Sequence, residues 1–371
     1  MFDDDAGARD QKSGWPDRRV MNLLGIDQPI LQAPMAGASN PLLTATVSEA
    51  GALGGYGAAG DRPDKLRGIV TEIRAHTDRP FNVNIFSAST EKFDRTARPG
   101  PRFTRLLEGY HRESGLGPVP DPRPLFGPAT EQLDILLEEG VPVISLHFGI
   151  DTGTVSRIHA AGARVLCTAT TVEEARILEA AGVDAIIAQG AEAGGHRGTF
   201  EGDFRTALVG TLALVPRVVD EVSVPVIAAG GIMDARGLVA CLALGASAVQ
   251  LGTAFLGCPE VPVAGAWHDA LAAAEAEHTV VTEAISGRAA RGLRNRYVDE
   301  VEALGEPLLP YPAQYSVSTD LRAASTKRRD SSFMSIWAGQ GVGLFSPTPA
   351  AELVQKLVAD SRQLMRRLNF E

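Results

Sequence analysis

The sequence predicts an α/β protein built as a (β/α)₈ TIM barrel with a smaller, mostly helical C-terminal domain. Short apolar stretches alternate about eight times with segments of helical spacing, and glycine marks the short turns that lead from helix to strand. An open doubly wound sheet usually stops at about five or six strands and carries GxGxxG after its first strand. No such motif follows the first expected strand here, so the alternation favours the barrel.

The expected strands are short apolar runs, which are typical of parallel strands buried on both faces. They span 29–35, 53–56, 81–86, 141–147, 164–168, 184–188, 224–229 and 248–251. The helices expected around them span 18–24, 40–50, 63–76, 130–139, 151–161, 172–181, 207–222 and 235–244. Pro41 suits the first turn of its helix, and Gly182 suits the C-terminal end of another.

The domain organisation follows from where this alternation begins and ends. Residues 1–20 are polar and acidic and predict a flexible N-terminal tail, and residues 21–258 carry the barrel. We expect residues 340–371, with an amphipathic helix at 349–369, to pack back on the barrel and close it. Residues 259–339 predict a helical substrate-capping domain, for which extra surface helices without a role at the site are the alternative.

Two segments interrupt the regular pattern. In the capping region, residues 264–278 and 291–304 predict helices, and residues 279–285 predict a short extended piece. The insertion at 90–126 is rich in proline, glycine and arginine, with a short helix expected at 104–113. Long segments of this kind are either functional lids or surface elaborations, and the sequence leaves both open.

The composition is that of a soluble globular protein of 371 residues with 44% hydrophobic residues. A net charge of -10 and a pI near 5.3 argue against nucleic acid or an anionic membrane as partners. No apolar run reaches the length of a membrane span, and the acidic N-terminus is unlike a signal peptide. The cysteines lie far apart without metal-ligand spacing, which predicts buried thiols in a reducing compartment; they are Cys167, Cys241 and Cys258. We therefore expect a cytoplasmic protein without a bound metal.

The loop at 188–198, AQGAEAGGHRG, is the strongest candidate for a functional site. It follows an expected strand, and its glycines permit tight turns and close approach of the backbone to a ligand. Catalytic groups in a barrel sit on such loops at the carboxyl ends of the strands, which makes His196 the candidate catalytic residue. A solvated loop whose histidine has no function is the alternative.

Two further loops predict a phosphate site. Residues 229–232 and 250–253 follow the seventh and eighth strands, where barrels commonly bind phosphate through backbone N–H groups. Thr253 adds a hydroxyl donor. The phosphate would belong either to a substrate or to FMN, in which case Gln189 and Asn84 suit the edge of the flavin ring.

Several segments together resemble the nitronate monooxygenase family, formerly called 2-nitropropane dioxygenase. They are 32–37 (QAPMAG), 189–198 (QGAEAGGHRG), 228–232 (AAGGI), 250–255 (QLGTAF), 311–312 (YP) and 337–341 (WAGQG). The resemblance implies an FMN-dependent barrel enzyme that oxidises alkyl nitronates, and in some cases nitroalkanes, with O₂ to a carbonyl compound and nitrite. The residues that it places against FMN are Asn84, Gln189, Gly194, Gly231, Gln250, Gly252 and Thr253. His196 is the implied catalytic residue; Tyr311, Tyr315 and Trp337 are candidates for the substrate wall, with simple packing as the alternative.

The chemistry of His196 stays open at this stage. A protonated His196 would bind the oxygens of a nitronate, whereas a neutral one would take the α-proton of a nitroalkane. Glu192 is a second possible base, which we expect Arg197 to neutralise. Two other functions remain: an FMN-dependent enoyl-thioester reductase using NAD(P)H, and a non-catalytic FMN-binding module. The sequence leaves the physiological substrate open, and it is compatible with either a monomer or a homo-oligomer.

Overall fold

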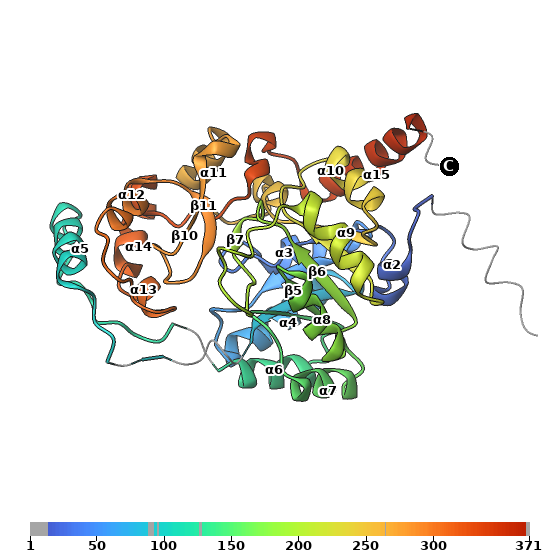
Figure 1. Cartoon of the computed structure of the whole chain (residues 1–371), viewed down its shortest axis with the longest axis horizontal. Coiled ribbons are helices and arrows are strands. Elements are labelled where there is room, and N and C mark those ends of the chain that lie inside the picture. The colour runs from blue at the N-terminus through green and yellow to red at the C-terminus, as the bar shows by residue number, and fades with distance from the viewer. Residues whose placement is uncertain (1–13, 88–92, 95, 126–127, 264, 369–371) are drawn as a thin grey trace, which may run out of the picture.

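A closed parallel barrel forms the larger part of the molecule (Figure 1). The computed structural model describes residues 14–87, 93–94, 96–125, 128–263 and 265–368. Within them, eight parallel strands lie in the order β1-β9-β8-β6-β5-β4-β3-β2. The outer strands of that order meet at a Leu31–Leu53 bridge, and Gln32 N–H donates to the Leu53 carbonyl at 2.9 Å. The sheet therefore closes on itself, and the predicted (β/α)₈ barrel is confirmed.

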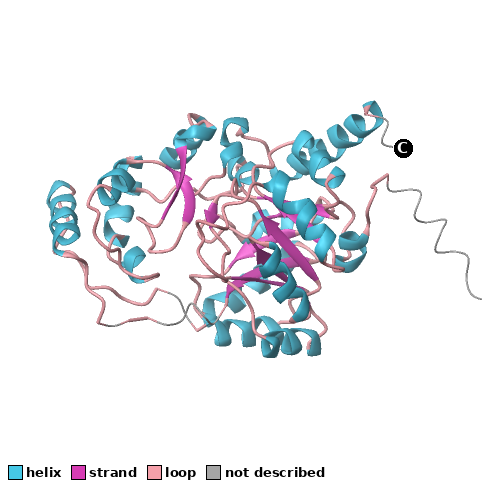
Figure 2. Ribbon diagram, viewed as in Figure 1, coloured by secondary structure: helices cyan, strands magenta, loops and turns pink. Residues whose placement is uncertain are grey.

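The barrel elements follow the sequence expectation closely. The strands are β1 (Ile30–Gln32), β2 (Gly54–Gly57), β3 (Phe81–Phe86), β4 (Val143–His147), β5 (Arg164–Ala169), β6 (Ala185–Gln189), β8 (Val226–Ala229) and β9 (Ala248–Leu251). The helices are α2 (Arg19–Leu24), α3 (Pro41–Glu49), α4 (Pro63–His76), α6 (Ala129–Glu138), α7 (Thr152–Ala160), α8 (Val172–Ala180), α9 (Thr211–Glu221), α10 (Ala235–Ala243) and α15 (Ala350–Arg367). The strand interiors are almost fully buried, as a sheet covered by helices on its outer face requires (Figure 2).

Side-chain caps explain where several helices begin. Asn40 accepts a hydrogen bond from Leu43 N–H at the start of α3. Helix α9 begins at Thr211, four residues later than expected at Ala207, because the carboxylate of Glu192 accepts the Thr211 N–H at 2.8 Å. The C-terminal helix α15 packs against α3 and α10 and so covers the barrel wall.

Residues beyond the barrel form short helices and a small antiparallel sheet. The helices are α11 (Gly265–Ala272), η3 (Ala276–His278), α12 (Arg296–Glu302), α13 (Ala313–Ser316), α14 (Thr319–Arg328), η4 (Ser331–Phe333) and η5 (Gln340–Leu344). The sheet joins β10 (Thr279–Thr282), β11 (Ala290–Leu293) and β7 (Gly195–His196). The helix expected at 291–304 was wrong in its first part, since residues 290–293 pair with two other strands. Asn295 caps α12 through Val298 N–H, so the helix starts only there.

A second hydrophobic core lies in this region, and part of the insertion belongs to it. Helix α5 (Pro101–Glu113) buries Phe103, Leu107 and Tyr110 in that core, next to α12 and α14 in Figure 1. The Tyr110 hydroxyl donates to the Glu300 carboxylate at 2.8 Å. The described part of the insertion therefore supports the second core.

Some expectations fall outside the described residues. These are residues 1–13 of the expected tail, residues 90–92, 95 and 126 of the insertion, residue 264 of the helix expected at 264–278, and residues 369–371 of the C-terminal segment. The domain boundaries at 21–258, 259–339 and 340–371 stay a prediction. Across the described chain, every helix is too short or too polar to cross a lipid bilayer.

Candidate active site

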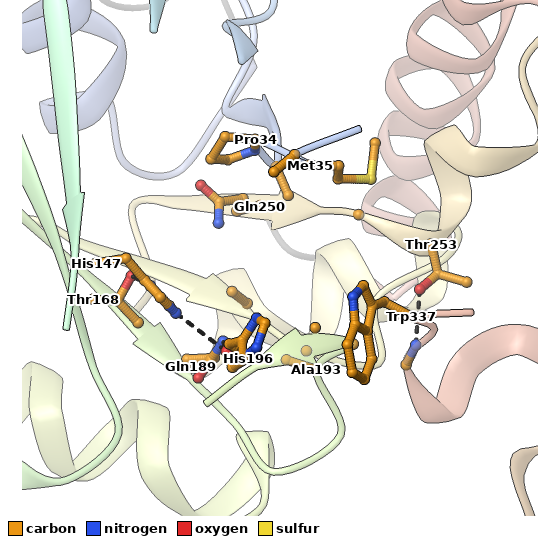
Figure 3. A pocket seen from close by; sticks show the side chains of 18 of the residues that line it. Pro34, Met35, His147, Thr168, Gln189, Ala193, His196, Gln250, Thr253 and Trp337 are labelled. Atoms are coloured by element: carbon orange, nitrogen blue, oxygen red, sulfur yellow. Dashed lines mark hydrogen bonds between the residues drawn. The ribbon is translucent and has the colours of Figure 1, made fainter. Parts of the chain in front are cut away.

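One cavity lies at the carboxyl ends of the barrel strands (Figure 3). Its volume is ≈ 250 Å³, and its walls come from the loops that follow the strands and from the second core. The residues that were expected to bind the cofactor, to act in catalysis or to form the substrate wall all line it: Asn84, Gln189, Gly194, His196, Gly231, Gln250, Gly252, Thr253, Tyr311, Tyr315 and Trp337. The barrel thus brings together loops that are far apart in the chain.

A buried arginine holds the histidine loop in shape. The side chain of Arg197 is 1% exposed, and its guanidinium donates to the carbonyls of Gly190 (2.6 Å), Gln189 (3.0 Å) and Ala207 (3.2 Å). Its expected partner Glu192 instead caps helix α9 and does not line the cavity. Glu192 is therefore set aside as the base, and Arg197 serves as the internal support of the loop.

Gln189 also has partners inside its own loop. Its amide N–H donates to the His196 carbonyl at 3.0 Å, and its amide oxygen accepts the Gly198 N–H at 2.9 Å. Asn84 donates in the same way to the carbonyl and hydroxyl of Ser145, each at 3.0 Å. Both amides line the cavity, but these hydrogen bonds join them to other parts of the protein.

The backbone and the ring of His196 are fixed separately. His147 Nε2–H donates to the His196 carbonyl at 3.1 Å (dashed in Figure 3), and the ring Nε2 lies 2.9 Å from the Ser286 hydroxyl. The rings of Tyr311 and Trp337 pack beside the imidazole, with centroids 5.5 and 5.3 Å away. The histidine therefore lies in an aromatic wall of the cavity, with its backbone carbonyl and its ring both hydrogen-bonded.

The surroundings of His196 keep it neutral. Burial, together with the nearby His147 and the Arg288 guanidinium, lowers the pKa of His196 from 6.5 to about 3. Burial likewise lowers the pKa of His147 to about 4. At pH 7 the imidazole of His196 carries no charge, which favours its interpretation as a proton acceptor.

The glycine loops form a cradle opposite this wall. Gly230 and Gly231 have φ angles of 123° and 70°, which strain any residue with a Cβ atom. A Cβ on Gly194 would lie 2.6 Å from the Ala338 backbone, so that glycine is needed for packing. A Cβ on Gly252 would meet Ala33 at an ordinary 3.5 Å.

Gln250 and Thr253 complete the polar side of the cavity. The amide oxygen of Gln250 is buried without a hydrogen-bond partner among the described residues, and burial of such an atom is costly unless a ligand supplies the donor. The Thr253 hydroxyl accepts the Gly339 N–H at 2.9 Å (Figure 3). A cradle of glycines beside an unpartnered acceptor fits a flat, hydrogen-bonding cofactor with a phosphate, such as FMN.

Some site residues were not predicted. His147 lies at the carboxyl end of an expected strand, which is where barrels carry functional side chains, so its position was a usable signal. Ser286 and Arg288 come from the turn between β10 and β11, about ninety residues from His196, and no local pattern marks them. In the described chain, no group of three or more His, Cys, Asp or Glu side chains is placed to hold a metal ion.

Comparisons with known proteins agree on the family. The sequence model of the nitronate monooxygenase family matches residues 17–360. The nitronate monooxygenase of Pseudomonas aeruginosa is 45% identical over 349 residues, which cover 93% of this chain and 99% of that protein. Among solved structures, nitroalkane oxidase from Streptomyces ansochromogenes has a TM-score of 0.85 at 37% identity, covering 94% and 99% of the two chains. FabK from Thermotoga maritima has a TM-score of 0.73 at 31% identity, covering 95% and 98%. The chain therefore belongs to the nitronate monooxygenase family of oxidoreductases.

Proposed function

We propose that this protein oxidises alkyl nitronates with O₂ to a carbonyl compound and nitrite, with FMN as its cofactor, and that it also accepts neutral nitroalkanes. The observation that carries the proposal is the neutral His196 on the wall of a cavity lined by glycine loops. Family membership supports the nitronate chemistry, and the buried, unpartnered Gln250 oxygen supports a bound ligand.

The cofactor would lie in the cavity against the loops at 229–232 and 250–253, the second of which carries Gln250. Gly231, Gly252 and Thr253 would hold its phosphate, and Gln250 and Asn84 would face its ring. Bound there, FMN would supply the redox chemistry that links oxidation of the nitronate to reduction of O₂. The protein contributes the shape of the cavity, the fixed dipoles around it and the exclusion of water.

The residues on the opposite wall would bind the substrate. Tyr311 and Trp337 pack against His196 and present aromatic surface to the alkyl group. Arg288, with its guanidinium 3.7 Å from the centroid of the Phe148 ring, contributes positive potential that favours an anionic nitronate. His196 is then needed as a general base only when the substrate still carries its α-proton.

The cofactor assignment predicts a yellow protein. We expect the purified chain to carry one FMN per chain, released by denaturation, because the glycine cradle and the Gln250 acceptor form one continuous site. Absorbance spectroscopy and quantitation of the released flavin measure it. A colourless protein that takes up no FMN from excess would refute the proposal.

Gly231 offers a direct test of the cradle. Its φ of +70° disfavours a side chain, and a Cβ there would lie 3.2 Å from Glu192, so Gly231→Val is expected to weaken FMN binding severalfold. Gly162 is the matched control, because it has a φ of +78° but open space around it and does not line the cavity. FMN titration of both apoproteins decides: equal affinity for the two valine variants contradicts the placement of the cradle.

The choice of reductant separates the two enzymatic functions. A nitronate oxidiser is reduced by a nitronate and only slowly by NADPH, whereas an enoyl-thioester reductase needs NAD(P)H. Anaerobic mixing with each compound, followed by the loss of flavin absorbance, measures the two rates. Rapid bleaching by NADPH would transfer the proposal to the reductase, and no bleaching by either compound would favour the non-catalytic module.

A further inference from the structure

We propose that Ser286 is a positioning residue that fixes His196 in its Nε2–H tautomer, so that the unprotonated Nδ1 is the atom that accepts a proton in the cavity. The assignment of the tautomer stands on the hydrogen bonds around Ser286 and on the neutral state of the His196 ring. Its catalytic consequence rests on the proposed function, because only a nitroalkane brings a proton to be removed.

The tautomer follows from counting protons around one hydroxyl. The Ser286 hydroxyl donates its single proton to the Arg288 carbonyl at 2.9 Å. It can therefore only accept from the His196 ring, whose Nε2 lies 2.9 Å away. A neutral imidazole has one N–H group, so Nδ1 must carry the lone pair.

Nδ1 is open to a ligand. Among the described residues Nδ1 has no hydrogen-bond partner, and it is not fully enclosed by protein atoms. Since His196 lines the cavity, the lone pair is available there. The ring therefore presents an acceptor, and not an N–H donor, to whatever the cavity binds.

Ser286 is itself held rigidly on both sides. It is 1% exposed and lies in the turn between β10 and β11. Gly287 has a φ of +79°, and a Cβ there would lie 2.3 Å from the Leu309 carbonyl, so the turn is pressed against that segment. On the other side Arg288 donates to the Thr199 carbonyl at 2.6 Å. The hydroxyl thus has a defined place and does not follow the ring.

The other hydrogen bonds of His196 involve its backbone and not its ring. Its carbonyl accepts from both His147 and Gln189, and β7 pairs with β11 with His196 opposite Ala290. These contacts place the backbone but do not choose which ring nitrogen is protonated. Ser286 is the contact that makes this choice, although it does not line the cavity itself.

The proton balance of the step is simple. The α-carbon of the nitroalkane gives its proton to Nδ1, and the electron pair of the broken C–H bond stays on the substrate as the nitronate. His196 becomes an imidazolium whose Nε2–H is still held by Ser286. No oxidant or reductant takes part in this transfer.

The tautomer can be read directly by NMR of the FMN-loaded protein with ¹⁵N-labelled histidine. Long-range ¹H–¹⁵N correlations distinguish the two nitrogens of each neutral ring, and His196→Asn assigns the signals of this residue. We expect a pure Nε2–H pattern in the wild type at pH 7. An Nδ1–H pattern, or a mixture of the two, in the wild type overturns the proposal.

Ser286→Ala and Ser286→Thr extend the test. The alanine variant is expected to show mixed His196 tautomers, and threonine, which keeps the hydroxyl, is expected to restore the Nε2–H form. His147 is the internal control, because its own Nε2–H donates to a backbone carbonyl that is unaltered, so its pattern should stay constant. A pure Nε2–H tautomer in the alanine variant would show that Ser286 does not set it.

Kinetics connect the tautomer to function. Ser286→Ala should lower kcat on a nitroalkane about tenfold to a hundredfold, a loss comparable to that of other groups that orient a functional histidine, with nitronate turnover changed less than about threefold. If the tautomers shift as expected but the wild type turns over no nitroalkane, the nitroalkane part of the proposed function fails and the role of Ser286 as a positioning residue stands. Equal losses on both substrates overturn the catalytic role of the tautomer.

Discussion

Replacing His196 by Asn is expected to lower nitroalkane turnover by about a hundredfold to ten-thousandfold, the usual cost of removing a positioned general base. Asparagine keeps a polar side chain of modest size but has no basic nitrogen. Glu192, the second base that the sequence suggested, is occupied at the start of α9 and does not line the cavity. A nitronate arrives without the α-proton, so its oxidation should survive in reduced form.

The decisive measurement compares the two forms of one compound. Steady-state rates with the nitroalkane and with its nitronate are measured for wild type and His196→Asn at matched flavin content. Since the pKa of His196 is lowered to about 3, the neutral base is already present at pH 5, and wild-type turnover of the nitroalkane should not fall between pH 7 and pH 5 through this group. Equal losses on both forms would mean that His196 positions the ligand or stabilises charge instead.

Replacing Arg197 by Met is expected to lower the free energy of unfolding by about 3–5 kcal/mol, because each buried carbonyl that is left without a donor costs about 1–3 kcal/mol. The guanidinium donates to three carbonyls that methionine cannot reach; those of Gln189 and Ala207 would lose this donor, whereas the Gly190 carbonyl keeps the Ala193 N–H at 3.1 Å. Methionine fills a similar volume, so the loss should come mainly from these carbonyls and not from a cavity.

Urea unfolding of both proteins, followed by tryptophan fluorescence and circular dichroism, measures this loss. Arg205→Met is the matched control, because that side chain is 64% exposed and its ion pairs with Asp203 and Glu283 lie at the surface. The control should lose less than about 1 kcal/mol. An equally small loss for Arg197→Met would show that water replaces the guanidinium and that the loop does not depend on it.

The barrel was predictable because its cause is local. Apolar runs such as 185–189 and 226–229 mark buried strands whatever the rest of the chain does, and the barrel then brings their following loops together. That is why residues as distant as Asn84 and Gln250 were rightly expected in one place. Their roles in binding a ligand stay predictions, because two side chains can line the same cavity without either forming a hydrogen bond to the ligand.

The features that the sequence did not predict depend on pairing between distant segments. Residues 290–293 have helical spacing, yet they form β11 because β10 and β7 offer backbone partners on both sides. In the sequence Glu192 is a charged loop residue, and only the folded chain places its carboxylate at the Thr211 N–H, where α9 begins. Ser286 is one serine among many until the β10–β11 turn brings it to the His196 ring.

The pairing of β7 with β11 has a consequence for how the protein loses activity. Strand β7 belongs to a barrel loop, whereas β11 is attached to the second core, so His196 and Ser286 meet only while the two are docked. Proteins open locally at free energies below that of global unfolding. An opening that separates β11 from β7 would free the imidazole to rotate while the barrel stayed folded. Heat inactivation should therefore precede the melting of the barrel, and amide hydrogen exchange at Arg197, whose N–H donates to the Ala289 carbonyl, should report the opening that causes it.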